Sequence, residues 1–146
     1  MPSSTEPTQQ AAATPTDKAA AGSPSANGKK MVLIVEDERP LAHALEMKLK
    51  NEGYTTHTCM NGTDALAELD KGGYGLVLLD LIMPVMDGFG VLTEMQQRKY
   101  NIPAIVLSNL GQDEDRAKTK QLGAVDYFVK SNTPIAIIVQ RVKSVL

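Results

Sequence analysis

The run Leu76–Leu79, followed at once by Asp80, constrains the fold more than any other stretch of this chain. Four consecutive apolar residues are typical of a strand that is buried on both faces, as in a parallel sheet covered by helices. Pro84 and the pair Asp87-Gly88 then indicate a loop and the beginning of a helix, so Asp80 falls at the carboxyl end of the strand. Ligand-binding and catalytic groups of open α/β sheets gather at that edge. Taken alone, Asp80 would more often be an ordinary turn residue.

Apolar runs alternate with helical patterns on both sides of this strand. Four more strands are expected, at 31–35, 54–58, 103–107 and 124–129. Helices are expected from Pro40 to about Gly53, from Asn61 to about Gly72, from 87 to 98, from 112 to 121 and over the stripe Ile135, Ile138, Val139 and Val142. The helix at 112–121 has a thin apolar face, made of Ala117 and Leu122. Five βα units with short connections predict an α/β fold, a doubly wound parallel sheet with helices on both faces.

Composition allows one folded domain and excludes several classes of protein. Residues 1–30 are rich in Ala, Pro, Ser and Thr and have no large aliphatic side chain after Met1, so we expect a disordered tail before a domain at 31–146. The formal net charge of -2 gives no polycationic surface for direct nucleic-acid binding. The single Cys59 excludes an internal disulfide. No apolar run approaches the roughly 18 residues of a membrane span, and we expect a cytoplasmic protein.

Polar side chains follow four of the five predicted strands. They are Glu36 and Asp37, Asp80, Ser108 and Lys130. Because the carboxyl ends of parallel strands share one edge, three carboxylates would meet there and repel one another unless a cation intervenes. Mg²⁺ is the natural candidate, since it is a hard ion that prefers oxygen ligands. A lysine ammonium and a serine hydroxyl suit phosphoryl oxygens, so the set predicts phosphoryl-transfer chemistry.

These residues, with the run 83–88 (Met-Pro-Val-Met-Asp-Gly) and with Tyr127 three positions before Lys130, resemble the receiver domain of bacterial response regulators. The resemblance covers about residues 30–146. It implies a flavodoxin-like fold with the strand order 2-1-3-4-5. One position departs from the family pattern, because Ser131 follows Lys130 where the family usually has proline.

Carried over by position, the resemblance implies a role for each site residue. Asp80 is then the phosphoacceptor, Ser108 and Lys130 hold the phosphoryl group, and Tyr127 is an aromatic switch. It also implies that Mg²⁺ is held by Glu36, Asp37, Asp80 and the backbone carbonyl of Ile82.

The function implied is a stand-alone signalling module, because the chain ends within its last predicted helix at Leu146. Its phosphoryl donor would be a histidine kinase or a histidine phosphotransfer domain. Its output would be protein–protein contacts with an unknown target, or a phosphorelay. We expect that the protein is not an enzyme and that it catalyses only its own phosphoryl transfer and a slow dephosphorylation.

Two other functions remain as alternatives. A phosphohydrolase of the haloacid-dehalogenase type also forms an aspartyl phosphate, but it needs a second aspartate two residues after the nucleophile. Ile82 occupies that position and argues against turnover. The other alternative is a receiver-like scaffold that is never phosphorylated; the retained acidic, serine and lysine residues argue against it.

Overall fold

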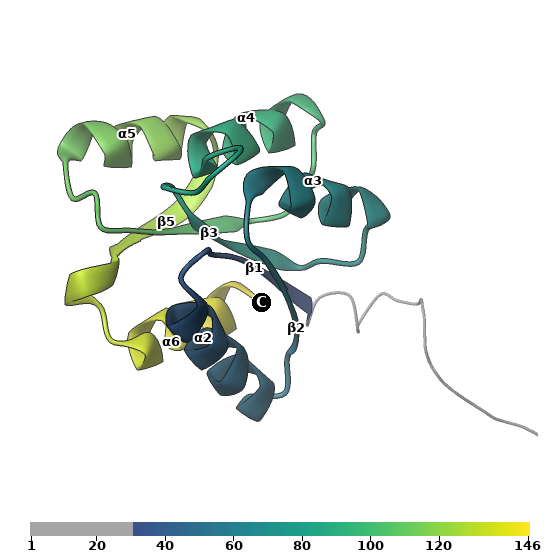
Figure 1. The fold of residues 1–146 in the computed structure, drawn as a ribbon, viewed down its shortest axis with the longest axis vertical. Coiled ribbons are helices and arrows are strands. Elements are labelled where there is room, and N and C mark those ends of the chain that lie inside the picture. Colours follow the sequence, from purple (N-terminus) through teal and green to yellow (C-terminus); the bar gives the residue numbers. More distant parts are fainter. Residues whose placement is uncertain (1–30) are drawn as a thin grey trace, which may run out of the picture.

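A single parallel sheet, with strands in the order β2-β1-β3-β4-β5, organises residues 31–146, the part of the chain that this computed structural model describes (Figure 1). The strands are β1 (Met31–Val35), β2 (Thr55–Cys59), β3 (Leu76–Asp80), β4 (Ala104–Ser108) and β5 (Ala124–Val129). The α/β class and the strand order expected from the sequence are therefore confirmed. The expected disordered tail at 1–30 lies outside the described residues.

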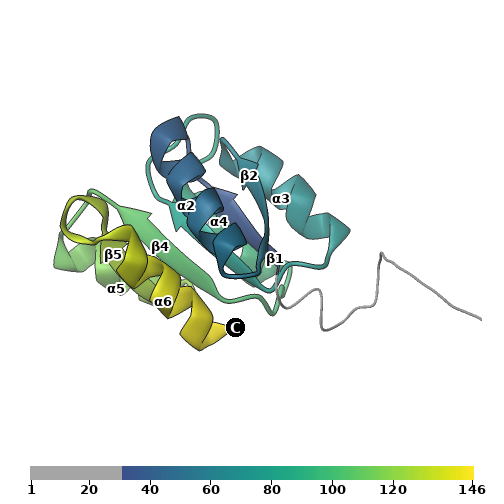
Figure 2. The ribbon, with the colours of Figure 1, turned by 90° about the horizontal axis from the view of Figure 1, so that it is seen from below.

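Helices cover both faces of the sheet, as the doubly wound pattern predicts (Figures 1 and 2). They are α2 (Arg39–Asn51), α3 (Gly62–Lys71), α4 (Gly88–Gln97), α5 (Asp113–Gln121) and α6 (Ile135–Val145), with a short 3-10 turn, η2 (Lys130–Asn132). Helices α3, α4 and α5 lie on one face, and α2 and α6 lie on the other. Within residues 31–146, no helix has the length and the apolar character that a membrane crossing requires.

The sheet separates two apolar cores, which explains the unbroken hydrophobic runs in its central strands. In β1, Leu33 and Val35 face the core under α3 and α4, whereas Val32 and Ile34 face the core under α2 and α6. All four side chains are fully buried. Burying a side chain of this size contributes about 1.5–3 kcal/mol to stability, so the central strands are rigid supports for whatever follows them.

Helix α5 contributes little to either core. The sequence predicts that Ala117 faces inward, but Ala117 is exposed and Thr119 is the buried residue of this helix. The Thr119 hydroxyl donates to the carbonyl of Arg116 at 3.0 Å, so the buried threonine leaves no unpaired polar group. Leu122, the other expected apolar residue, is half-buried against the core of α3 and α4. We therefore expect α5 to be held less firmly than the other helices.

The loop after β3 is fixed by the beginning of α4. Asp87 caps this helix by accepting a hydrogen bond from the amide of Gly90 at 2.9 Å. The amide of Gly88 donates to the carbonyl of Leu81 at 3.0 Å. A side chain at Gly88 would collide with the Asp80 carbonyl and would lie 2.8 Å from the Cα of Leu81. Glycine is therefore needed for α4 to approach the end of β3 this closely.

Candidate functional site

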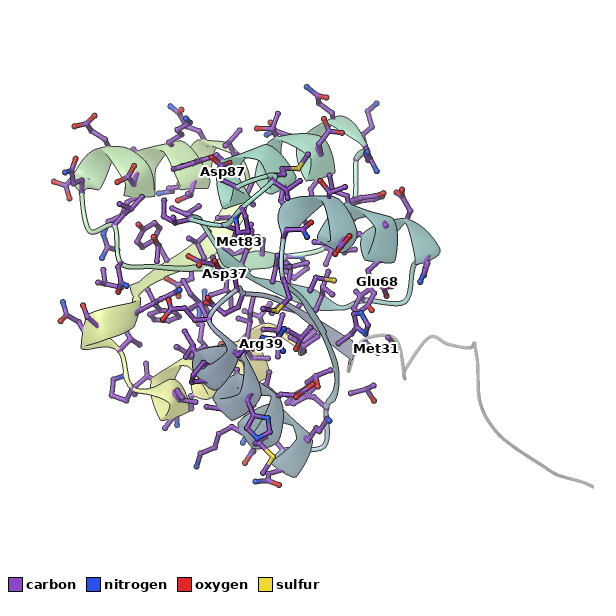
Figure 3. All side chains as sticks on the ribbon, viewed as in Figure 1. Met31, Asp37, Arg39, Glu68, Met83 and Asp87 are labelled. Atoms are coloured by element: carbon purple, nitrogen blue, oxygen red, sulfur yellow. The ribbon has the colours of Figure 1, made fainter. Side chains whose placement is uncertain are left out.

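The register of the sheet brings the polar strand ends together. Val35 of β1 pairs with Leu79 of β3, so Glu36 and Asp80 follow side by side. Ser108 of β4 pairs with Val129 of β5, immediately before Lys130. In the view of Figure 3, Asp37 and Met83, which lies in the loop after β3, are on the same side of the molecule, away from Met31, the first residue of β1. The predicted site residues therefore share one edge.

The ammonium group of Lys130 lies at the centre of the site. Its Nζ is 3.0 Å from Oδ2 of Asp80 and 2.7 Å from Oε2 of Glu38. It is also 2.8 Å from Oε1 and 3.0 Å from Oε2 of Glu36. Only 8% of the Lys130 side chain is exposed. Lys130 therefore reaches Asp80 although Ser131, and not proline, follows it.

Burial and charge act against each other at this site. Burial raises the pKa of Glu36 to about 7, although hydrogen bonds from Lys130 and the Glu38 amide lower it. Burial also raises the pKa of Asp80, again against the effect of Lys130. Burial lowers the pKa of Lys130, but its hydrogen bonds to Glu36, Glu38 and Asp80 outweigh burial, so this pKa is raised above its ordinary value. The site thus holds more acidic groups than one lysine neutralises.

The oxygen donors at this edge fit a magnesium ion. Glu36, Glu38 and Asp80 each offer a carboxylate oxygen, and these oxygens lie within 4.8 Å of one another. Asp37 and Ile82 line the same cleft as Asp80. The buried Oε1 of Glu36 receives no hydrogen bond of good geometry, so it has lone pairs left for a cation. A set made of carboxylates is what a hard divalent cation prefers.

Glu38 is the residue that the sequence analysis missed. It is the third member of the acidic run 36–38 and precedes a helix, and no local pattern in the sequence distinguishes it from an ordinary solvated side chain. Asp37, which was predicted as a ligand, lines the cleft without belonging to the tight carboxylate group. The assignment of Asp37 and of the Ile82 carbonyl to the metal stays a prediction.

Ser108 and Tyr127 lie beside each other on the β4 and β5 side of the site. Ser108 is fully buried, and its Oγ accepts a hydrogen bond from the amide of Leu110 at 3.1 Å. This hydrogen bond does not use the proton of the Ser108 hydroxyl. The Tyr127 ring is buried, which raises the pKa of its hydroxyl. The Arg116 guanidinium lies 4.8 Å from the centre of that ring. The switch role expected of Tyr127 stays a prediction.

The sequence matches the family model described as the response regulator receiver domain over residues 32–142. It is 38% identical over 120 residues to a protein of Pyropia yezoensis named "Probable transcriptional regulator ycf27", covering 82% of this chain and 49% of the relative. It is 36% identical over 115 residues to the transcriptional regulatory protein SrrA of Staphylococcus aureus, covering 79% and 47%. The chain thus spans about half the length of these curated relatives.

Solved structures agree with the fold. A Francisella response regulator receiver domain matches with a TM-score of 0.76 and 27% identity, covering 80% of this chain and 95% of that one. The response regulator TrrA of Thermotoga maritima, solved in complex with Mg²⁺ and BeF, matches with a TM-score of 0.70 and 32% identity, covering 80% and 99%.

Proposed function

Because this chain belongs to the response regulator receiver domain family, we propose that it is a phosphorylation-activated signalling module whose phosphoacceptor is Asp80. The donor is a histidine kinase or a histidine phosphotransfer domain, and the protein acts in the cytoplasm. Its output is a protein–protein contact or a phosphorelay, with no direct contact to nucleic acid or membrane.

The observation that carries this proposal is the 3.0 Å contact between Asp80 Oδ2 and Lys130 Nζ. The two side chains line a cleft of about 310 Å³ that is open to a donor. In the transfer step, an oxygen of the Asp80 carboxylate forms a bond to phosphorus. The bond from phosphorus to the donor nitrogen breaks, and that nitrogen keeps the electron pair. Lys130 and the Ser108 hydroxyl donate to the phosphoryl oxygens as charge develops on them.

The carboxylates of Glu36, Asp37 and Asp80, with the Ile82 carbonyl, are the groups that would hold Mg²⁺. When bound, the ion neutralises charge on the phosphoryl oxygens. The residues of the chain supply positioning, which is most of what phosphoryl transfer needs from a protein.

The site supports acceptance of a phosphoryl group better than enzymatic turnover. Ile82 lines the cleft where a phosphohydrolase would place its acid–base carboxyl group, and an aliphatic side chain cannot transfer a proton. We therefore propose that the protein catalyses only its own phosphorylation and a slow loss of the phosphoryl group. A scaffold that is never phosphorylated has no use for a buried Asp80–Lys130 pair, which is costly to form.

Mass spectrometry after exposure to acetyl phosphate tests the proposal. We expect a single phosphoryl addition that requires Mg²⁺ and is lost in Asp80→Asn. The control is Asp113→Asn, which removes an exposed carboxylate at the first residue of α5 and should leave the addition unchanged. No addition to the unaltered chain would favour the scaffold. Addition that survives Asp80→Asn would place the acceptor elsewhere.

A further inference from the structure

The three N–H groups of the Lys130 ammonium are all engaged within the described chain. They donate to Glu36 Oε2 at 3.0 Å, to Glu38 Oε2 at 2.7 Å and to Asp80 Oδ2 at 3.0 Å. A lysine ammonium has no fourth hydrogen to offer. If Lys130 is to donate to a phosphoryl oxygen, one of these three carboxylates must first release it.

The three carboxylates differ in what their release would cost. The side chains of Glu36 and Asp80 are 1% and 4% exposed, so in the metal-free site losing the ammonium would leave a buried charge unpaired. The side chain of Glu38 is 56% exposed, and water can replace its partner at little cost. Glu38 is therefore the partner that gives way.

We propose that Glu38 is a positioning residue, an exchangeable counter-ion that holds Lys130 in the cleft and yields its place to an incoming phosphoryl oxygen. Glu38 thereby sets how readily the site accepts a donor, because each acceptance must break its contact with Lys130. Its carboxylate also lines the cleft through which a negatively charged donor enters. This inference rests on the proposed function, since it concerns phosphorylation at Asp80.

The geometry of α2 makes this inference testable by a mild substitution. Glu38 is the residue that precedes α2, and its side chain makes no capping hydrogen bond. The hydrogen bond between the Glu38 amide and Glu36 Oε2, at 3.0 Å, involves only the backbone of Glu38. Glu38→Gln therefore removes the negative charge that pairs with Lys130, and it leaves the first turn of the helix and the Glu36 contact in place.

The experiment measures phosphorylation by acetyl phosphate as a function of its concentration, followed by mass spectrometry with Mg²⁺ in excess. A bond forms between an Asp80 oxygen and phosphorus, the bond from phosphorus to the acetate oxygen breaks, and acetate leaves with the electron pair. In Glu38→Gln we expect the half-saturating acetyl phosphate concentration to fall about two- to five-fold, the scale of one exposed ion pair. The maximal rate should change less.

Two further variants separate a direct contact from other effects. Glu38→Asp keeps the charge but retracts it by one methylene, so it should also lower the half-saturating concentration. Glu52→Gln is the matched control, because Glu52 forms an exposed 2.8 Å ion pair with Lys143 away from the site. It should behave as the unaltered chain does. Calorimetry gives the Mg²⁺ affinity of each variant separately.

Several results would overturn the inference. These are an unchanged or higher half-saturating concentration in Glu38→Gln, an effect of Glu38→Gln that Glu38→Asp lacks, and an equal effect of Glu52→Gln. A loss of Mg²⁺ affinity of about ten-fold or more in Glu38→Gln would make Glu38 part of the metal site instead. If the unaltered chain takes no phosphoryl group, the proposed function fails as well. If it takes one and Glu38→Gln behaves like it, only this inference fails.

Discussion

The hydroxyl of Tyr127 donates a hydrogen bond to the backbone carbonyl of Leu110 and so connects β5 to the loop that follows Ser108. The amide of Leu110, in the same loop, donates a hydrogen bond to Oγ of Ser108 at 3.1 Å. A movement of Ser108 toward a phosphoryl group would therefore displace the carbonyl that Tyr127 binds. Helix α5 begins just after this loop and has few apolar anchors, so it is the element best able to respond.

We predict that Tyr127→Phe loosens this connection. Removing the hydroxyl leaves the Leu110 carbonyl without its partner, which should cost about 1 kcal/mol of stability and speed amide hydrogen exchange over 109–112. On phosphorylation, exchange in the unaltered chain should change most over 109–122 and 127–131. Hydrogen exchange with mass spectrometry measures both effects.

The control for this prediction is Tyr74→Phe. The Tyr74 hydroxyl donates to Oε1 of Glu68 at 2.7 Å. Glu68 lies in α3 and Tyr74 lies just before β3, so this hydrogen bond does not involve β5 or the loop at 109–112. This variant should lose stability without faster exchange over 109–112. If both variants give the same exchange in that loop, Tyr127 has no particular connection to it.

A second prediction concerns strain in the loop after β3. Val85 has a φ of 69°, and the amide of Met86 donates to the carbonyl of Pro84 at 2.8 Å, closing a tight turn around Val85. A positive φ costs an ordinary residue about 1–2 kcal/mol, and a β-branched side chain is among the least tolerant. Glycine costs about 0.5–1 kcal/mol in lost backbone entropy. Val85→Gly should therefore raise the free energy of unfolding by up to about 1 kcal/mol.

Denaturant unfolding measures this change, and Val125→Gly is its matched control. Val125 is also an exposed valine, at 45% exposure, but it lies in β5 and does not have a positive φ. Glycine there should destabilise by about 1 kcal/mol, because no strain is relieved. Equal destabilisation by the two substitutions would show that the turn at Val85 stores no strain.

The strand ends were predictable from the sequence because buried parallel strands have a simple signature. The apolar run 76–79 and Asp80, the polar residue that directly follows this run, located the edge of the sheet without any long-range information. The strand order came from the resemblance, since alternation of strands and helices gives only the fold class. That order makes β1 and β3 neighbours, but the register that brings Glu36 beside Asp80 is set by the packing of the two strands.

Contacts between distant and exposed residues were not predictable in this way. Glu38 and Lys130 are separated by 92 positions, and an exposed glutamate before a helix has no local pattern that distinguishes it. In α5 the sequence favoured Ala117 as a core residue over Thr119, because apolar periodicity does not foresee a buried hydroxyl that bonds to its own helix. The first case depends on tertiary packing and the second on a hydrogen bond of a side chain. Neither can be predicted from the pattern of hydrophobic residues alone.

A third prediction concerns the lifetime of the phosphorylated state. Loss of the phosphoryl group needs a water molecule oriented for in-line attack, and Ile82 lines the cleft beside Asp80 with a side chain that cannot orient water. Ile82→Asn should therefore accelerate dephosphorylation, and pairing it with Leu110→Glu should accelerate it further. Phosphorylation by acetyl phosphate should change less. Intact-mass measurements after removal of the donor give the rate.

The control for Ile82→Asn is Val85→Asn. Val85 is an exposed aliphatic residue of the same loop, at 82% exposure, but it does not line the cleft. Its replacement should leave the dephosphorylation rate unchanged. The water-exclusion argument is wrong if Ile82→Asn with Leu110→Glu hydrolyses no faster than the unaltered chain, or if Val85→Asn hydrolyses equally fast.

The last prediction concerns pH. Burial raises the pKa of Glu36 to about 7 in the folded chain, from 4.5 in the unfolded chain. Between these values the folded state binds more protons than the unfolded state, so without Mg²⁺ the stability should fall as pH rises from about 4.5 to about 7. Mg²⁺ needs deprotonated carboxylates. The rise in melting temperature that Mg²⁺ produces should therefore grow through the same window and level off above about pH 7.

Thermal unfolding with and without Mg²⁺, from about pH 5 to about pH 8, measures this effect, and Glu36→Gln is the informative variant. It removes the titrating carboxyl group, so its response to Mg²⁺ should depend less on pH. Asp37→Asn should weaken the response at every pH. Lys143 lowers the pKa of the exposed Glu52, and Lys71 lowers the pKa of the half-buried Glu68. The contributions of both groups change only below about 4.5 and do not interfere. An equal Mg²⁺ response at both ends of the range, or metal-free stability that rises across it, would contradict a protonated Glu36 at the site.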